Sequence, residues 1–168
     1  MKSYNLSNIH FLLVEHNAYT RKLLKLILNA FRCRNIREAE TGVEALEILQ
    51  DLYRPDIIIT DWQMPVMDGI ELVRILRRGE AGSDPFVPII MVTAHTDKGH
   101  ILMARDSGVN EILAMPVSPK MLYGRIARVI EHPRPFVRSK LYFGPDRRRG
   151  TNKNYAGPER RKEDPTEH

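Results

Sequence analysis

Five short apolar runs alternate with five amphipathic segments over the first 132 residues of the chain. The runs lack the three- and four-residue spacing of a helix, so each is predicted to be a buried strand. They comprise residues 9–14, 36–39, 57–60, 89–92 and 111–114. The intervening segments carry apolar residues at helical spacing, as at Leu72, Val73 and Leu76, and are predicted to be helices.

Polar residues, two glycines and a proline mark the ends of these helices. Asn17, Thr41, Gly69 and Pro119 are predicted to begin helices, and Gly108 to end the one over residues 101–107. The apolar faces of the first two helices are predicted to be Leu23, Leu24, Ile27 and Phe31, and Val43, Leu46, Ile48 and Leu49.

This alternation predicts an α/β fold for residues 1–132. Short apolar strands separated by helices form a parallel sheet that is covered on both faces, so we expect a five-stranded, doubly wound, flavodoxin-like domain. In such folds the ligand site lies outside the carboxyl ends of the strands. Those ends carry Glu15, His16, Asp61, Thr93 and Met115.

The charge of the chain is concentrated in its last 36 residues. The chain holds 26 Lys and Arg against 21 Asp and Glu, a formal net charge of +5. Residues 133–168 contain ten basic and five acidic residues, which leaves residues 1–132 neutral. This arginine-rich extension, residues 133–168, is therefore expected to meet an anionic partner, such as a nucleotide, a nucleic acid or an acidic protein surface.

Composition also limits where the protein acts. No run approaches the roughly 18 apolar residues of a membrane span, so no membrane insertion is expected. The first eight residues lack the apolar stretch of a secretory signal, and the single cysteine, Cys33, suits a reducing compartment. We expect a cytoplasmic protein.

Three motifs connect residues 8–132 with a known family. They are the nine-residue segment from Asp61 to Gly69 (DWQMPVMDG), the segment Val92–Ala94, and Met115-Pro116. With these motifs the segment resembles the CheY-like receiver domain of two-component response regulators. The resemblance implies that the position of Asp61 accepts a phosphoryl group. It also implies that an acidic pair, this aspartate and the carbonyl of Gln63 hold magnesium.

The chain departs from the receiver pattern at three positions. The acidic pair reads Glu15-His16, and an imidazole is a poor magnesium ligand. Met115 stands where the family has a lysine, and a thioether cannot pair with a phosphoryl group. Ile112 replaces the switch aromatic, whereas the hydroxyl of Thr93 is retained.

These departures leave three interpretations of the site. We favour a vestigial phosphoacceptor site, formed by Asp61, Glu15, His16, Thr93 and Met115, in a domain without catalytic residues. Magnesium binding is then weak or absent, and no metal is expected. The alternatives are a weak acceptor at Asp61, as in a phosphorylated single-domain regulator, and a transition metal held by His16 with Glu15 and Asp61.

The extension contains a repeat of eight residues. YFGPDRRR at residues 142–149 recurs as YAGPERRK at residues 155–162, so that aromatic, glycine, proline, acid and basic residues all align. A solvated linker needs composition but not order, which argues against that simpler interpretation. The extension has too few apolar residues for a core of its own and is predicted to be largely disordered when free.

The repeat combines groups that recognise guanine and phosphate. Arginine can pair with phosphate or a guanine edge, a carboxylate can accept from the guanine amino group, and tyrosine can stack on the base. Two copies favour a ligand with two-fold symmetry, and cyclic di-GMP fulfils each condition, alone or as an intercalated pair. The predicted binding residues are Tyr142, Gly144, Asp146, Arg147, Arg148, Arg149, Tyr155, Gly157, Glu159, Arg160 and Arg161.

A receiver with a degenerate site and this extension resembles the Cle subgroup, the CheY-like cyclic di-GMP effectors. The resemblance implies a non-enzymatic effector that acts at the flagellar motor switch to tune motility or attachment. By analogy, the motor partner would contact the surface around residues 98–105, Ile112 and residues 121–128. Nucleic-acid binding through the basic extension is the less favoured alternative.

Overall fold

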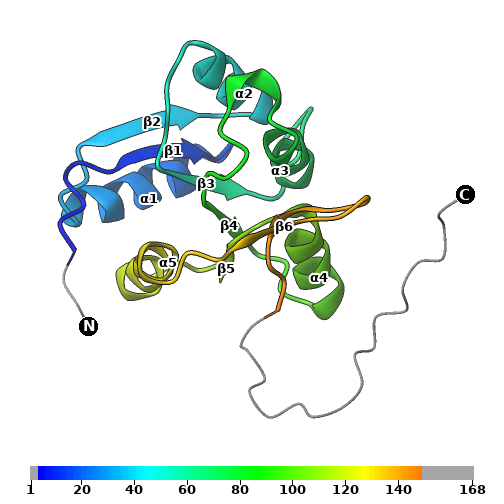
Figure 1. Ribbon diagram of the computed structural model, residues 1–168. Coiled ribbons are helices and arrows are strands. Elements are labelled where there is room, and N and C mark those ends of the chain that lie inside the picture. Colours follow the sequence, from blue (N-terminus) through cyan, green and yellow to red (C-terminus); the bar gives the residue numbers. More distant parts are fainter. Residues whose placement is uncertain (1–3, 149–168) are drawn as a thin grey trace, which may run out of the picture.

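The computed structural model describes residues 4–148, and residues 1–3 and 149–168 lie outside the description. Its centre is a five-stranded sheet with the order β2-β1-β3-β4-β5, in which all neighbouring strands are parallel (Figure 1). This confirms the predicted doubly wound α/β fold. The strands are β1 (His10–Val14), β2 (Asn35–Ala39), β3 (Ile57–Asp61), β4 (Ile89–Thr93) and β5 (Glu111–Ala114).

Five α-helices connect and follow these strands. They are α1 (Ala18–Ala30), α2 (Gly42–Gln50), α3 (Gly69–Arg77), α4 (Lys98–Ser107) and α5 (Pro119–Glu131), with a short 3₁₀ helix η1 (Glu80–Gly82) after α3. Asn17 and Thr41 cap α1 and α2 as predicted, because their side chains accept from free backbone amides. Helix α4 begins three residues earlier than predicted, since Asp97 caps it by accepting from the His100 amide.

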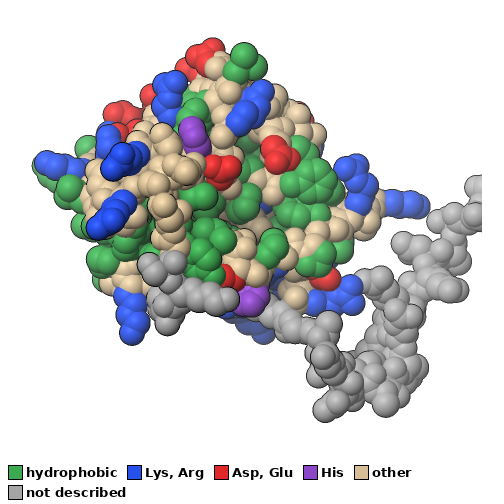
Figure 2. Space-filling model, turned by 60° about the vertical axis from the view of Figure 1, so that its left-hand side comes forward, with side chains coloured by type: hydrophobic (Ala, Val, Ile, Leu, Met, Phe, Trp, Pro, Cys, Tyr) green, Lys and Arg blue, Asp and Glu red, His purple; other side chains and the backbone are tan. Residues whose placement is uncertain are grey.

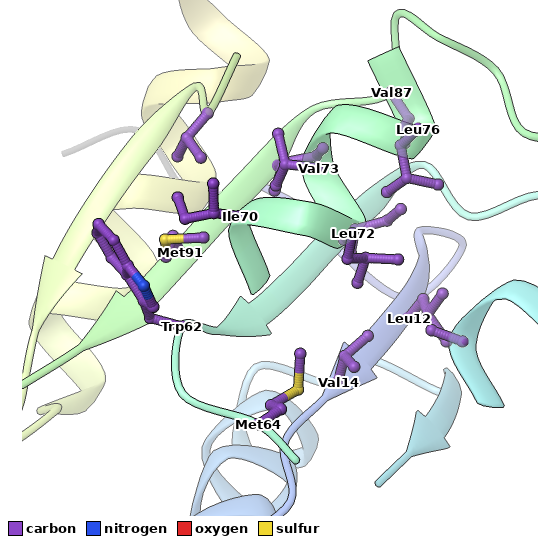
Figure 3. Close-up of a cluster of buried hydrophobic side chains, with 14 of the residues drawn as sticks. Leu12, Val14, Trp62, Met64, Ile70, Leu72, Val73, Leu76, Val87 and Met91 are labelled. Atoms are coloured by element: carbon purple, nitrogen blue, oxygen red, sulfur yellow. The ribbon is translucent and has the colours of Figure 1, made fainter. Parts of the chain in front are cut away.

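The sheet separates two apolar layers. On one side, Leu12 and Val14 of β1 pack with buried residues of α2, α3 and α4; Figure 3 shows Leu72, Val73 and Leu76 of α3 in this layer. The alternate residues of β1 point to the opposite side, where α1 and α5 cover the sheet. Both faces of the sheet are therefore buried, which explains why the three central strands, β1, β3 and β4, are almost continuously apolar in sequence.

The predicted apolar faces of α1 and α2 need one correction each. Leu23 is 47% exposed and Val43 is 40% exposed, whereas Leu28 and Ala45 are fully buried. Both helices have more apolar residues than their buried stripe can hold. Spacing alone therefore allowed two choices of face, and packing against the sheet selects between them.

The extension contains a structural element that the sequence analysis did not predict. Strands β6 (Phe136–Arg138) and β7 (Phe143–Pro145) form an antiparallel hairpin. The rings of Phe136 and Phe143 lie 5.0 and 5.3 Å from the ring of Phe86, in the loop before β4. This aromatic cluster gives the hairpin an apolar contact with the α/β domain, so residues 136–145 are structured against that domain.

Within residues 4–148, no helix is both long and apolar enough to cross a lipid bilayer.

Candidate functional site

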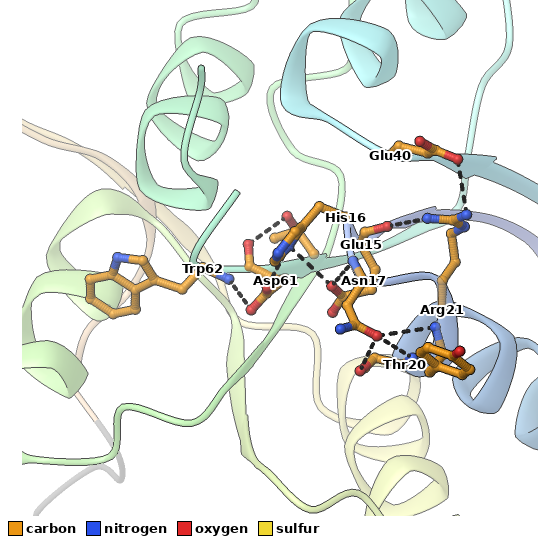
Figure 4. Close-up of polar contacts among 10 residues, drawn as sticks. Glu15, His16, Asn17, Thr20, Arg21, Glu40, Asp61 and Trp62 are labelled. Carbon is orange, nitrogen blue, oxygen red and sulfur yellow. Dashed lines mark hydrogen bonds and ion pairs between the residues drawn. The ribbon is translucent and has the colours of Figure 1, made fainter. Parts of the chain in front are cut away.

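The carboxyl ends of the strands bring together Glu15, His16 and Asp61, as the sequence predicted. The Nδ1 atom of His16 lies 3.4 Å from Oε1 of Glu15 and 3.5 Å from Oδ2 of Asp61 (Figure 4). Glu15 is almost completely buried, Asp61 is largely buried, and His16 is 44% exposed at its side chain. The imidazole therefore closes the two carboxylates off from solvent on its own side.

Backbone amides hold both carboxylates in place. The amide of Asn17 donates to Oε1 of Glu15 over 2.8 Å, and the amide of Trp62 donates to Oδ1 of Asp61 over 2.6 Å. A guanidinium nitrogen of Arg21 donates to the backbone carbonyl of Glu15 over 2.7 Å. The start of α1 and the loop after β3 thus fix the geometry of the pair (Figure 4).

Burial controls the electrostatics of this pair. Desolvation raises the pKa of Asp61, although the amide of Trp62 and the nearby His16 act in the opposite direction. Desolvation also raises the pKa of Glu15, against the effect of the hydrogen bond from Asn17, and the charge of Asp61 raises it further. Two carboxylates close together repel each other, and a single exposed imidazole does not remove that cost.

Thr93 and Met115 complete the predicted site without adding charge. Thr93 is buried, and its Oγ1 atom accepts a hydrogen bond from the amide of His95 over 3.0 Å. Met115 is half-buried, and its side chain packs against the apolar layer beneath α1 and α5. Its thioether is therefore part of the packing and cannot replace an ammonium group opposite Asp61.

The donor set does not fit the magnesium site of receiver domains. One ligand atom from each of Glu15, His16 and Asp61 lies within 4.8 Å of the others. Magnesium takes oxygen ligands in a strict octahedron, and here an imidazole replaces one carboxylate. A mixed nitrogen and oxygen set of this kind suits zinc, copper or nickel better. Weak or absent magnesium binding stays a prediction.

The described part of the extension brings several predicted ligand-binding residues together. Tyr142, Asp146, Arg147 and Arg148 line an open cavity of about 720 Å³. Gly144 lies in β7 and is buried. The remaining predicted residues, Arg149, Tyr155, Gly157, Glu159, Arg160 and Arg161, lie outside the described residues.

Internal contacts organise this first copy of the motif. The hydroxyl of Tyr142 donates to the carbonyl of Pro145 over 2.7 Å, which curls the ring over the intervening glycine. The guanidinium of Arg147 lies 4.5 Å from the centre of the Tyr142 ring and also pairs with Asp106 of α4 over 3.0 Å. The sequence analysis missed Asp106, because nothing in the sequence links it to a partner 41 residues later.

A second cluster anchors the extension at the start of β5. The carboxylate of Glu111 is only 2% exposed and accepts from Arg125 and Arg128 of α5. Arg134, the first arginine of the extension, joins them at 3.1 Å from Oε1 of Glu111. Its guanidinium is thus paired with Glu111 of the α/β domain, which makes Arg134 an anchor of the extension.

The surface of the α/β domain carries mixed charge. On the face shown in Figure 2, acidic side chains are interspersed among basic ones and do not gather into a single patch. This agrees with the neutral balance of residues 1–132 and leaves the extension as the basic part of the chain.

Comparison with known proteins matches the receiver part of the chain. The family model of the response regulator receiver domain matches residues 11–127. A chemotaxis protein CheY homolog of Campylobacter jejuni is 34% identical over 119 residues, which cover 71% of this chain and 90% of that protein. Chemotaxis protein CheY1 of Helicobacter pylori is 33% identical over 119 residues, covering 71% and 94%.

Solved structures with the same fold include two that are similar in sequence. The chemotaxis protein CheY4 of Vibrio cholerae superposes with a TM-score of 0.65 at 30% identity, covering 72% of this chain and 98% of the other. The receiver domain of a sensor histidine kinase from Pseudomonas aeruginosa gives a TM-score of 0.65 at 29% identity, covering 73% and 98%. That structure holds a magnesium ion in its active-site cleft.

Proposed function

Because the chain belongs to the family of response regulator receiver domains, we propose that it is a CheY-like signalling effector that binds cyclic di-GMP through its arginine-rich extension. The receiver domain is a signalling module and not a classical enzyme. The observation that carries the proposal is the repeat itself, at residues 142–149 and 155–162.

The state of the receiver site supports a sensor outside that site. His16 and Met115 remove a carboxylate and an ammonium group from the positions where the family holds magnesium and phosphate. The two remaining carboxylates keep raised pKa values because of their burial. A vestigial phosphoacceptor site leaves the domain without control by phosphorylation. In this proposal, ligand binding to the extension controls the domain instead.

The geometry of the first motif copy supports a nucleotide ligand. An aromatic ring, a carboxylate and two guanidinium groups line one cavity, contributed by Tyr142, Asp146, Arg147 and Arg148. Its volume of about 720 Å³ falls in the range of small-molecule sites, roughly 300–1,000 Å³. The groups for stacking, for accepting from a guanine edge and for pairing with phosphate thus lie in one place. The second copy would supply the same groups to the other half of the ligand.

The output follows from the relatives and from the Cle resemblance. The curated relatives are chemotaxis proteins. In this proposal the liganded chain acts at the flagellar motor switch, in the cytoplasm, and tunes motility or attachment. The contact surface is that of α4, β5 and α5, next to the hairpin of the extension (Figure 1).

Titration calorimetry of the full chain with cyclic di-GMP tests the proposal. We expect saturable binding with a Kd in the micromolar range or below. This corresponds to a favourable binding free energy of about 8 kcal/mol or more. Arg148→Ala and Arg161→Ala should each weaken binding by about tenfold, because each removes a charge-assisted contact. Arg74→Ala, which removes an exposed arginine of α3, is the matched control and should bind like the wild type.

The same titration separates the rival ligand. A nucleic-acid-binding extension would bind arbitrary DNA or RNA with a steep salt dependence. Binding of cyclic di-GMP that survives an excess of DNA supports the dinucleotide. Absence of heat from the full chain would refute the proposal.

A further inference from the structure

The first motif copy is bonded to itself and to α4. Each of its recognition side chains in the described structure has an intramolecular partner. The hydroxyl of Tyr142 is bound to the carbonyl of Pro145, and its ring lies against the guanidinium of Arg147. A ligand therefore meets a motif whose binding groups are already in use.

Among these contacts, that of Arg147 joins the residues that are farthest apart in sequence. Its Nη1 atom lies 3.0 Å from Oδ1 of Asp106, one residue before the end of α4. Asp106 also accepts from Arg105 at 2.9 Å. Although desolvation opposes it, the hydrogen bonds from these two arginines lower the pKa of Asp106, so it is ionised at neutral pH.

The acidic residue of the motif is engaged in a similar way. Oδ1 of Asp146 accepts from the backbone amide of Arg148 over 3.0 Å and faces its Nε atom at 3.3 Å. A guanine edge that binds this carboxylate competes with the same arginine. Before ligand binding, Asp106 of α4 thus offsets the charge of Arg147, and Asp146 offsets that of Arg148.

A nucleotide must compete with these contacts for the guanidinium of Arg147. A phosphate paired with this guanidinium would come to lie beside the carboxylate of Asp106. The phosphate and the carboxylate would then be closer than the Debye length, which is about 8 Å at physiological ionic strength. Their negative charges would therefore repel each other. A base that stacks on the covered face of Tyr142 must likewise displace the guanidinium, which lies 4.5 Å above the ring.

We propose that docking of Arg147 on Asp106 and binding of cyclic di-GMP by the first motif copy exclude one another. The proposal rests on the ligand proposed above and adds its regulation. Helix α4 is then a competitor for the motif, and ligand binding frees Asp106 and the last turn of α4. Ligand binding to the extension thus changes the contacts of the receiver at that helix.

The coupling is reciprocal. A partner that covers Asp106 removes the competitor of the ligand, so it raises the affinity for cyclic di-GMP by the factor with which the ligand favours the partner. The carboxylate at the end of α4 thus links the sensor to the surface proposed for the output.

Calorimetry on full-length variants tests the exclusion. Asp106→Asn keeps the shape of the side chain and removes the charge that holds Arg147. Exposed ion pairs of this kind contribute little each, so we expect cyclic di-GMP to bind about two- to fivefold more tightly. Glu47→Gln is the matched control, since it removes the same charge from an exposed position on α2. It should leave the Kd unchanged.

The possible outcomes are distinct. Tighter binding in Asp106→Asn alone supports the exclusion. An equal gain in Glu47→Gln would trace the effect to net charge and overturn it. Unchanged or weaker binding in Asp106→Asn would overturn it as well, because Asp106 would then have no effect on ligand binding or would help to position Arg147. If neither the wild type nor any variant produces heat, the proposed function fails and the exclusion fails with it.

Discussion

The Nδ1 atom of His16 lies 3.5 Å from the Oδ2 atom of Asp61. An imidazole therefore stands beside Asp61 at the position where the receiver pattern has a second carboxylate. Magnesium in a receiver needs that carboxylate as an oxygen ligand and neutralises the charge that develops on the phosphoryl group. The contact between His16 and Asp61 is thus the structural feature on which our prediction of a vestigial phosphoacceptor site rests.

The wild-type chain should acquire little phosphate. With acetyl phosphate and magnesium, mass spectrometry should show substoichiometric labelling of the wild type. The double variant His16→Asp, Met115→Lys restores the carboxylate and the ammonium group and should label severalfold more. Adding Asp61→Asn to that variant should abolish the signal. Stoichiometric labelling of the wild type that disappears in Asp61→Asn would instead identify an active response regulator.

Asp61→Asn should stabilise the fold at neutral pH. Burial raises the pKa of Asp61 in the folded state, so its protonation favours folding at low pH, and this contribution is lost as the pH rises through the folded-state pKa. The variant removes a buried charge at neutral pH, and its Tm should exceed that of the wild type by a few degrees.

The pH dependence provides the check on this interpretation. As the pH falls through the carboxyl range, Asp61 becomes protonated in the wild type, so the difference in Tm should shrink. Thermal unfolding followed by circular dichroism at neutral and acidic pH measures both values. Glu47→Gln, at an exposed position, should show no such difference at either pH. A gain that grows on acidification would contradict the role assigned to burial.

The elements of the receiver were predictable because their signals are local. Asn17, Thr41 and Gly108 mark helix ends by their own side chains or backbone preference, and the structure confirms all three. The approach of Glu15 to Asp61 was also predictable, because parallel strands end at the same edge of the sheet. Both inferences need only nearby residues and the sheet topology.

The contacts of the extension were not predictable for the opposite reason. Phe136 and Phe143 are too few to suggest a strand by alternation, and their packing depends on Phe86 about 50 positions earlier. The partner of Arg147 is likewise set by where the hairpin lies and not by any spacing. The exposure of Leu23 shows that local spacing is also insufficient within a helix, because the sequence of α1 allows more than one choice of apolar face.

Among the charged residues of the fold, Arg77 is the one whose substitution should reduce stability most. Its guanidinium is buried and donates to the carbonyls of Gly108, Pro85 and Val87 and to the side chain of Asn110, over 2.7–2.9 Å. Burial lowers its pKa to about 10, so it stays charged at pH 7. Arg77→Ala removes the donor to three backbone carbonyls and leaves Asn110 Oδ1 with only the Ile89 amide, so it should reduce the free energy of unfolding by about 3 kcal/mol.

Urea denaturation of Arg77→Ala beside Arg74→Ala measures this contribution. Arg74 lies on the same helix but is exposed, so its loss should change the free energy of unfolding by less than about 0.5 kcal/mol. Arg77 also lies 5.0 Å beneath the Phe136 ring, so the hairpin should loosen with it. Equal effects of the two substitutions would contradict the role given to the buried hydrogen bonds.

The glycine of the first motif copy should be required for docking of the hairpin. A Cβ atom on Gly144 would lie 2.6 Å from the hydroxyl of Tyr142 and 3.1 Å from the Cα of Gly108. Gly144→Ala must therefore displace the Tyr142 ring and widen the contact between the hairpin and Gly108, at a cost of about 1–3 kcal/mol. The amide of Asp146, which donates to the carbonyl of Pro135 over 2.7 Å, should then exchange with deuterium at least about tenfold faster.

Gly124→Ala in α5 separates this steric effect from the general effect of adding a methyl group. Nothing lies within 4 Å of a Cβ atom at that position, and alanine favours a helix by up to about 1 kcal/mol over glycine. This variant should leave the exchange of the Asp146 amide unchanged and raise the global stability. If Gly144→Ala also left that exchange unchanged, the hairpin would not depend on the close approach of Gly144 and Gly108. The glycine of the repeat would then serve the ligand alone.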